Sequence, residues 1–300
     1  MKRNIQAYLE LSLAMALAGS SVVAGKLLIS AFPVFLGGCL RFVAASLILV
    51  PWLLSSEKGF PRVNLKIWFY LFLQSLSGVF LFTVFMLVGL KYTTAIESGI
   101  ITSTTPAVLG IISFVFLKEQ LNGRKIAGIV LSLAGILVIN IASVNPNINR
   151  GPNPLLGNLL IFSAVVGEAL FTIFRKITSP VVSNLAGTTI LSVIALVMFI
   201  PFASIEAISF NWAQTPLQGW LVILYYGGFA TIVAFICWFR GLAKVPASTA
   251  AVFTGMMPLS AVILSCLVLR ESFSLYHLLG IILVLVGIGF AAIDHNTTRS

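Results

Sequence analysis

Long apolar runs of about twenty residues recur along the whole chain, separated by short polar stretches. Within the runs the apolar residues are continuous and do not alternate with polar ones, as they would in the strands of a membrane β-barrel. Because a helix satisfies its backbone hydrogen bonds within one segment, such runs are typical of membrane-spanning helices. The pattern predicts an all-α integral membrane protein with ten transmembrane helices, at about 7–28, 33–54, 67–90, 94–117, 123–142, 155–176, 181–203, 217–241, 246–269 and 275–293.

The composition agrees with a lipid environment. Of the 300 residues, 59% are hydrophobic and 9% are charged, whereas soluble domains average about 25% charged residues. The loops are short and leave no room for a soluble domain, so we expect no catalysis or nucleic-acid binding outside the membrane. The first apolar segment could pass for a signal peptide, but it is longer than a usual signal core and nine similar segments follow.

The net charge of +10 is explained by the placement of the basic residues. If the N-terminus is cytoplasmic, thirteen of the 18 basic residues fall at cytoplasmic helix ends, four fall at outer ends, and Arg41 lies within a segment. Positive residues favour the cytoplasmic side. We therefore expect a multi-pass protein of the cytoplasmic membrane, with both termini in the cytoplasm, and no nucleic-acid partner.

Side chains that could hold a metal or a cofactor are few and scattered. Cys39, Cys237 and Cys266 all lie inside apolar runs and show no CxxC spacing. His277 and His295 lie far apart near the end of the chain, and a nucleotide-binding motif is absent. We predict no metal site, no cofactor and no direct use of ATP.

The chain contains an internal repeat. The stretches PAVLGIISFVFLKE, at 106–119, and PLSAVILSCLVLRE, at 258–271, share one design, and a shift of 152 residues gives fifteen identities over the 52 positions of 89–140. A stretch of turn formers, NPNINRGPNP, lies between the two copies. We predict a first repeat with helices 1–5, a linker, a second repeat with helices 6–10 and a cytoplasmic tail, at 1–144, 145–154, 155–294 and 295–300.

Each copy has five helices, and five is an odd number. The second copy therefore enters the membrane from the opposite face, and the two copies form inverted repeats. This construction is typical of secondary transporters, in which the substrate site lies near the midplane between the repeats.

Several stretches together resemble the drug/metabolite transporter superfamily, of the type built from two EamA domains. They are AGSSVVAGK (18–26), LRFVAASLIL (40–49), GLKYTTAIESGIITSTTPAVLGIISFVFLKE (89–119), GIVLSLAGILVI (128–139), FTIFRK (171–176) and GLAKVPASTAAVFTGMMPLSAVILSCLVLRE (241–271). Their order and spacing carry the resemblance, which covers nearly the whole chain. It implies ten helices, cytoplasmic termini, and export or import of small metabolites, often amino acids. Two positions depart from the pattern: Ala18 replaces a common aromatic residue, and Glu168 replaces a neutral one.

Glu168 is the foremost candidate for a functional residue. It is the fourteenth residue of the segment 155–176, where a carboxylate costs several kcal/mol unless it is paired, hydrated or protonated. Thr172 and Arg175 follow it on the same helical face. Glu168 could accept a proton or recognise a cationic group in a wet cavity, or it could form a structural ion pair with Arg175 or Lys26. The sequence leaves both interpretations open.

Two matched prolines, Pro106 and Pro258, lie near the middle of their segments. Each removes the helical hydrogen bond to the carbonyl four residues back, and these carbonyls belong to Thr102 and Thr254. The freed carbonyls could serve a ligand or a water, or the prolines could be hinges that matter for packing alone. The substrate-binding candidates from these two segments are Ser98, Thr102, Thr105 and Thr254.

Other candidates are less specific. Gln74 shares a helical face with other polar residues, but glutamines in membrane bundles often bond only to neighbouring helices. Tyr225 and Trp238 belong to the eighth segment and could line the site or pack against lipid. For Arg41 we expect a buried structural role.

These features predict a secondary transporter that moves small organic metabolites, amino acids or related compounds, by alternating access, with export favoured. Its expected partners are a small-molecule substrate and membrane lipid, with proton coupling as an option and the oligomeric state left open. We predict no enzyme, because Glu168 is the sole acid at midplane depth. The alternative is a passive channel or a non-transporting receptor or subunit.

Overall fold

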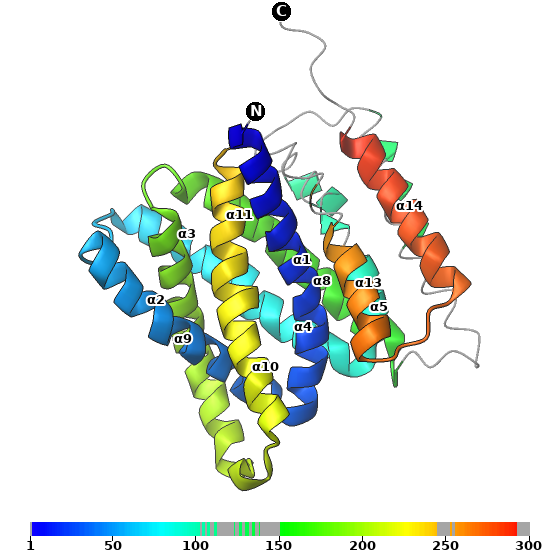
Figure 1. The fold of residues 1–300 in the computed structure, drawn as a ribbon, viewed down its shortest axis with the longest axis horizontal. Coiled ribbons are helices and arrows are strands. Elements are labelled where there is room, and N and C mark those ends of the chain that lie inside the picture. The colour runs from blue at the N-terminus through cyan, green and yellow to red at the C-terminus, as the bar shows by residue number, and fades with distance from the viewer. Residues whose placement is uncertain are drawn as a thin grey trace, which may run out of the picture.

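The computed structural model describes residues 2–102, 151–244 and 256–292, together with Phe253 and separate positions between 104 and 138. Every regular element in these parts of the chain is helical, and the helices pack into one bundle (Figure 1). Six helical stretches are long and apolar enough to cross a membrane: Ile5–Ala31, Val34–Glu57, Leu65–Tyr92, Pro154–Arg175, Asn184–Ser209 and Leu217–Leu242. This confirms an all-α protein with membrane-spanning segments.

The spans consist of single helices or of helices joined end to end. Four are single helices: α1 (Lys2–Ala31), α2 (Val34–Glu57), α8 (Pro154–Thr178) and α9 (Asn184–Ser209). Two spans are composite. The first consists of α3 (Leu65–Ser75), η1 (Leu76–Leu81) and α4 (Phe82–Tyr92). The second consists of α10 (Leu217–Gly227), η4 (Gly228–Val233) and α11 (Ala234–Leu242). A short 3₁₀ turn, η3 (Trp212–Gln214), precedes α10.

Three shorter helices occupy other expected segments. They are α5 (Ala95–Thr102), α13 (Met256–Val268) and α14 (Leu275–Ala292). The expected fifth segment, 123–142, lies largely outside the described residues. The count of ten helices therefore stays a prediction.

Polar side chains define where several helices begin. Asn64 accepts a hydrogen bond from the Ile67 amide at 3.0 Å at the start of α3, and Ser183 accepts one from the Ala186 amide at the same distance at the start of α9. At α8, Asn153 caps the helix and Pro154 takes its first position. These side chains satisfy amides that have no partner within their own helix, which is why the apolar runs become helical at these residues.

The elements η1 and η4 are six-residue π-helical segments in the middle of their spans. They are separated by 152 residues, which is the offset of the sequence repeat. Such segments within α-helices are frequent at functional sites. The same backbone irregularity thus occurs at corresponding positions of the two copies.

The packing follows the same correspondence. Helix α4 packs against α8, α11 packs against α1, and α2 packs against α9. By the sequence offset, α1 corresponds to α8, α2 to α9, and α4 to α11. Exchanging the two copies therefore reproduces these contacts.

The bundle has two ends that the site description uses. At the first end α1 begins and α8 and α11 finish, while at the second end α1 and α4 finish and α8 and α14 begin (Figure 1). Between them, η1 approaches α8 closely because Gly78 has no side chain, and a Cβ atom there would overlap the side chain of Phe171. This contact sets the distance between two walls of the central cavity.

Candidate functional site

A cavity of about 450 Å³ lies within the bundle and extends toward the first end. Its lining residues on α8 begin at Glu168 and continue to Ser179, just beyond the helix, and those near α11 run from Ala234 to Ala243. Further walls come from α1, α2, η1, α4, η4 and α13. The volume is in the range of small-molecule sites, which is about 300–1,000 Å³.

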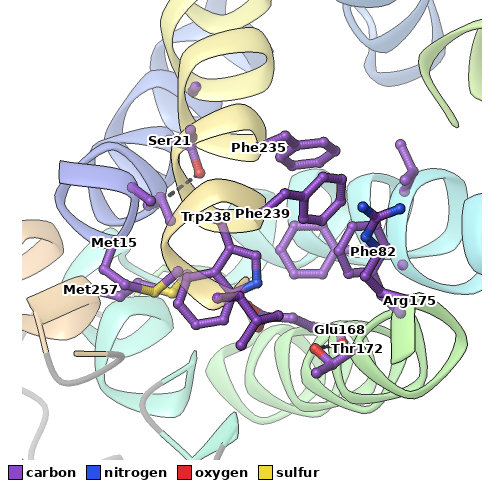
Figure 2. Close-up of a pocket in the computed structure, with 18 of the residues that line it drawn as sticks. Met15, Ser21, Phe82, Glu168, Thr172, Arg175, Phe235, Trp238, Phe239 and Met257 are labelled. Atoms are coloured by element: carbon purple, nitrogen blue, oxygen red, sulfur yellow. Dashed lines mark hydrogen bonds between the residues drawn. The ribbon is translucent and has the colours of Figure 1, made fainter. Parts of the chain in front are cut away.

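Glu168 lines this cavity from α8, and Thr105 lines it from the segment after α5. The Thr105 hydroxyl donates a hydrogen bond to Glu168 Oε2 at 2.9 Å. One turn along α8, Thr172 also lines the cavity, and its hydroxyl bonds to the Glu168 carbonyl oxygen at 3.2 Å. Figure 2 shows Glu168 and Thr172 on α8 and the aromatic side chains of α11 across the cavity.

Among the described residues, no ion pair joins Glu168 to either of the two expected cations. Lys26 donates to the carbonyl oxygens of Leu90 and Thr93 at the end of α4. Arg175 donates from Nη2 to Asn184 Oδ1 at 2.7 Å. The carboxylate of Glu168 therefore faces the cavity with a hydroxyl as its partner, not a cation.

Two arginines line the cavity, and both are almost fully buried. The guanidinium group of Arg41 lies 4.0 Å from the centre of the Tyr226 ring and donates from Nε to Thr231 Oγ1 at 2.7 Å. The guanidinium group of Arg175 lies 4.2 Å from the centre of the Phe239 ring. The cavity wall thus combines two cations with one carboxylate.

The remaining wall is apolar and largely aromatic. Trp238 lines the cavity from α11, as do its neighbours Phe235 and Phe239 (Figure 2). Met15 from α1 and Met257 from α13 add flexible thioethers, which adapt to ligands of different shape. The site therefore suits a small solute with an apolar body and charged or polar groups.

Tyr225, in contrast, lines a second cavity of about 370 Å³ between α1, α10 and α13. Its hydroxyl lies 2.6 Å from Ser20 Oγ. The structure thus places Tyr225 and Trp238 in different cavities, although both belong to one expected segment.

Other predicted residues that the structure describes do not line the central cavity. The hydroxyls of Ser98 and Thr102 donate to backbone carbonyls three or four residues back, those of Thr94 and Gly99. Gln74 is fully buried and receives a hydrogen bond from the Thr178 hydroxyl at 3.4 Å. Pro258 is buried in α13. Thr254 and Pro106 lie outside the described residues.

Sequence reasoning missed most of the aromatic wall and the cavity-lining role of the arginines. A helical stripe was available as a signal, because the α8 residues that line the cavity share one face. These residues are Glu168, Phe171, Thr172, Arg175 and Ser179. Helical spacing shows which residues share a face of α8 but not what that face contacts. The stripe alone could therefore not show whether these residues line a cavity or pack against another helix.

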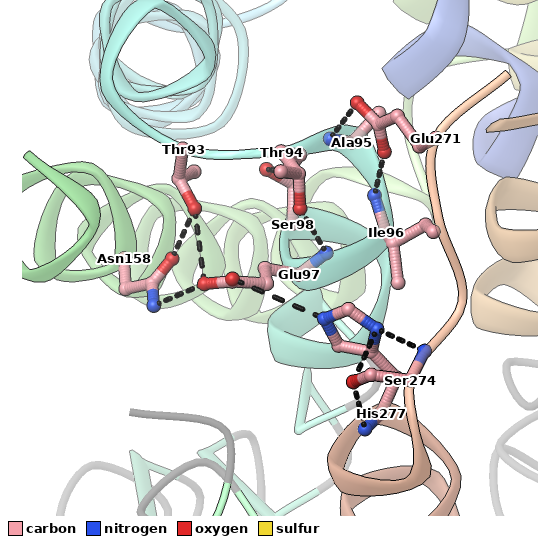
Figure 3. A network of polar contacts seen from close by, with 10 residues as sticks. All are labelled: Thr93, Thr94, Ala95, Ile96, Glu97, Ser98, Asn158, Glu271, Ser274 and His277. Carbon is pink, nitrogen blue, oxygen red and sulfur yellow. Dashed lines mark hydrogen bonds and ion pairs between the residues drawn. The ribbon is translucent and has the colours of Figure 1, made fainter. Parts of the chain in front are cut away.

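At the second end, a buried polar network joins segments that are distant in the sequence (Figure 3). Glu97 on α5 is fully buried, and Asn158 on α8 donates to its Oε2 atom at 2.8 Å. The Thr93 hydroxyl lies 3.1 Å from the same oxygen and 2.8 Å from Asn158 Oδ1. On α14, His277 Nε2 lies 4.0 Å from Glu97 Oε1.

Glu271 strengthens this junction by capping α5. Its two carboxylate oxygens accept hydrogen bonds from the amides of Ala95 and Ile96, each at 2.9 Å (Figure 3). A carboxylate is favourable at a helix N-terminus because it meets unsatisfied amides and the positive end of the helix dipole. The second end is therefore held together by residues from both halves of the chain.

Within the described parts of the chain, no three His, Cys, Asp or Glu side chains form a group that could hold a metal ion. The cysteines Cys39, Cys237 and Cys266 are free thiols.

A bundle of apolar helices around a small-molecule cavity is typical of membrane transport proteins. The chain belongs to the EamA-like transporter family, whose model matches residues 6–141 and again 155–293. This confirms the resemblance seen in the sequence. Membership of this family supports a membrane transport protein.

Relatives cover nearly the whole chain. The uncharacterized transporter YetK of Bacillus subtilis (strain 168) is 45% identical over 288 residues, which are 96% of this chain and 87% of that protein. An uncharacterized transporter of Archaeoglobus fulgidus is 24% identical over 291 residues, which are 95% of this chain and 96% of that protein. One crystal structure, 18% identical, matches with a TM-score of 0.68 over 96% of this chain and 98% of that chain, which shows a common fold.

Proposed function

We propose that this protein is a secondary transporter that carries small organic solutes across the cytoplasmic membrane by alternating access. The observation that supports this function is the one-sided cavity. It extends from the middle of the bundle to the first end, and its α8 lining begins only at Glu168. At the second end, buried hydrogen bonds of Glu97, Asn158 and Thr93 connect the helices.

A carrier differs from a channel in that its site opens to one side at a time. With both termini in the cytoplasm, as the basic residues predict, the first end is cytoplasmic and the cavity faces the cytoplasm. Export then begins by binding from this side. Corresponding contacts in the two copies, such as α4 with α8 and α11 with α1, support an exchange of conformations that closes one end as the other opens.

The lining supports a cargo of amino acids or related compounds. The aromatic side chains of α11 can pack against an apolar body, while Glu168 can hold an ammonium group or a proton. If Glu168 takes up a proton during the cycle, transport is coupled to the proton gradient. Thr105, which donates to Glu168 at 2.9 Å, then holds the carboxylate in position.

Counterflow in proteoliposomes tests this function. Vesicles are loaded with an excess of unlabelled amino acids, diluted into buffer with a trace of the labelled mixture, and compared with protein-free vesicles. A carrier accumulates label transiently above its equilibrium level, because internal solute returns the site to the outer face. Label that only equilibrates, at a rate independent of internal solute, would show a channel and refute alternating access.

A further inference from the structure

Arg175 has a donor that the described residues leave without a partner. The residue is 4% exposed, and its Nη1 atom is buried with no hydrogen-bond partner. Its other terminal nitrogen, Nη2, is held by Asn184 at 2.7 Å, and the guanidinium group stacks on Phe239. The group is therefore fixed in orientation while part of its bonding capacity remains unused.

Carboxylates do not compensate this charge in the described parts of the chain. The two nearest in sequence, Glu168 and Glu206, accept hydrogen bonds from Thr105 and from the Leu36 amide. The others are engaged with a cation, a hydroxyl, an amide side chain or helix amides, and they are Glu10, Glu57, Glu97 and Glu271. A buried guanidinium group without a carboxylate partner is unusual, because buried charges are normally paired.

The guanidinium group of Arg41, the other arginine of the cavity wall, has partners for more of its hydrogen-bond donors. Its Nε donates to Thr231, its Nη1 lies 3.5 Å from the Thr83 hydroxyl, and the guanidinium group stacks on Tyr226. Arg41 therefore contributes positive charge to the cavity, while Arg175 offers a buried donor that has no partner among the described residues. Two guanidinium groups against one carboxylate favour a ligand that brings a negative group.

We propose that Arg175 binds a carboxylate group of the transported solute. The assignment rests on the cavity being the transport site, as proposed above. A guanidinium group is planar and matches a carboxylate with parallel hydrogen bonds. Gly187 permits the observed position of the guanidinium group against α9, because a Cβ atom at that position would lie 2.8 Å from Arg175 Nη1.

The position of Arg175 also gives the cargo an orientation. Arg175 follows Glu168 by seven residues, which is about two turns on one face of α8. The carboxylate end of the solute lies toward the first end of the bundle, and the apolar body packs against the aromatic residues of α11. Glu168 remains for a second group of the solute or for a proton, so the cargo class is an apolar carboxylic acid, with or without an amine.

Ligand-induced thermal stabilisation of the purified protein tests the assignment, since a ligand that binds only the folded state raises its apparent stability. The probes come in two body sizes. Butyrate and phenylacetate carry only a carboxylate, butylamine and phenylethylamine only an amine, and 2-aminobutyrate and phenylalanine carry both. Inorganic phosphate serves as a different anion. We expect stabilisation by carboxylate-bearing probes of at least one size and none by the simple amines.

Variants then locate the binding group. R175Q should weaken binding of the stabilising carboxylates by about tenfold or more, and R175K should recover part of the affinity because it keeps the charge without the fork. The matched control is R240Q. Arg240 is also near the first end, but its side chain is 53% exposed and paired with Glu10 at 3.4 Å, so carboxylate affinity should be unchanged.

The outcomes separate this assignment from the proposed function. Any of four results would overturn the assignment of Arg175. They are stabilisation by amines alone, stabilisation by phosphate above every carboxylate, the absence of stabilisation by all carboxylates, and wild-type carboxylate affinity in folded R175Q. The first three need no variant, so they hold even if R175Q fails to fold. Carboxylate binding that depends on Arg175 but gives no counterflow would refute the transporter and keep the site. Counterflow of solutes that lack a carboxylate, at a rate unchanged in R175Q, would support the transporter and refute the carboxylate site at Arg175.

Discussion

Replacing Asn158 with leucine should destabilise the second end of the bundle. Asn158 is 3% exposed, donates to Glu97 Oε2 at 2.8 Å, and has its Oδ1 atom 2.8 Å from the Thr93 hydroxyl. Leucine keeps the branched shape, with a somewhat larger volume, but offers neither a donor nor an acceptor. The Glu97 carboxylate and the Thr93 hydroxyl would remain buried with one partner fewer.

The size of the effect follows from the two bonds. A hydrogen bond to a charged group contributes about 1.5–3 kcal/mol and a neutral one about 1 kcal/mol. Because members of one network are not additive, we expect a loss of about 2–4 kcal/mol in the free energy of unfolding. At about 2–4 °C per kcal/mol for a chain of this size, the unfolding midpoint should fall by about 5 °C or more.

Thermal unfolding of the purified protein in one detergent measures this shift. The control is N211L, because Asn211 is exposed before η3 and its side chain makes no hydrogen bond to the described residues. A second comparison uses T93V alone and together with N158L, and the double variant should lose less than the sum of the two single losses. Equal midpoints for N158L and N211L would refute the stabilising role of the network.

Three further predictions concern the cavity and the topology. E168Q should fold and still exchange solute but lose concentrative uptake by about tenfold or more if the carboxylate carries a proton or a cationic group; normal concentrative uptake would contradict this role. G187A should weaken carboxylate affinity by about tenfold at an unchanged maximal rate, because the added Cβ would lie 2.8 Å from Arg175 Nη1; unchanged affinity would show that the guanidinium position is unimportant. A single cysteine at position 149 should react with an impermeant reagent from outside and one at position 122 should not; the reverse pattern would invert the topology.

The apolar pattern predicted the six long apolar helices well, because lipid and helix geometry together allow few alternatives. The segment expected at 155–176 appears as α8, Pro154–Thr178, and its start is defined by the Asn153 cap and the following proline. The pattern could not predict η1 and η4. A π-helical turn in an apolar span buries the same kinds of side chain as an α-helical turn, so the hydropathy of the sequence is unchanged.

The structure places some of the sequence candidates together and others apart. Glu168, Thr105 and Trp238 do line one cavity, whereas the hydroxyls of Ser98 and Thr102 donate to backbone carbonyls three or four residues back. Periodicity assigns residues to one face of a helix, but the relative rotation of two helices decides which faces meet at a cavity. That rotation depends on close contacts between segments distant in the sequence, such as that of Gly78 with Phe171.

The charges of the cavity on α8 have no counterpart in α1. An alignment of Lys26 with Lys176, at an offset of 150 residues, places Glu168 opposite Ala18 and Arg175 opposite Gly25. Gly25 packs against leucine side chains of α4. The two copies therefore share the π-helical segments and the corresponding helix contacts. Of the charged groups in the cavity wall, the first copy supplies Arg41 from α2 and the second supplies Glu168 and Arg175 from α8. Under the proposed alternating access, this asymmetry predicts one site that is exposed in turn to the two sides, and not two sites, one in each half of the membrane.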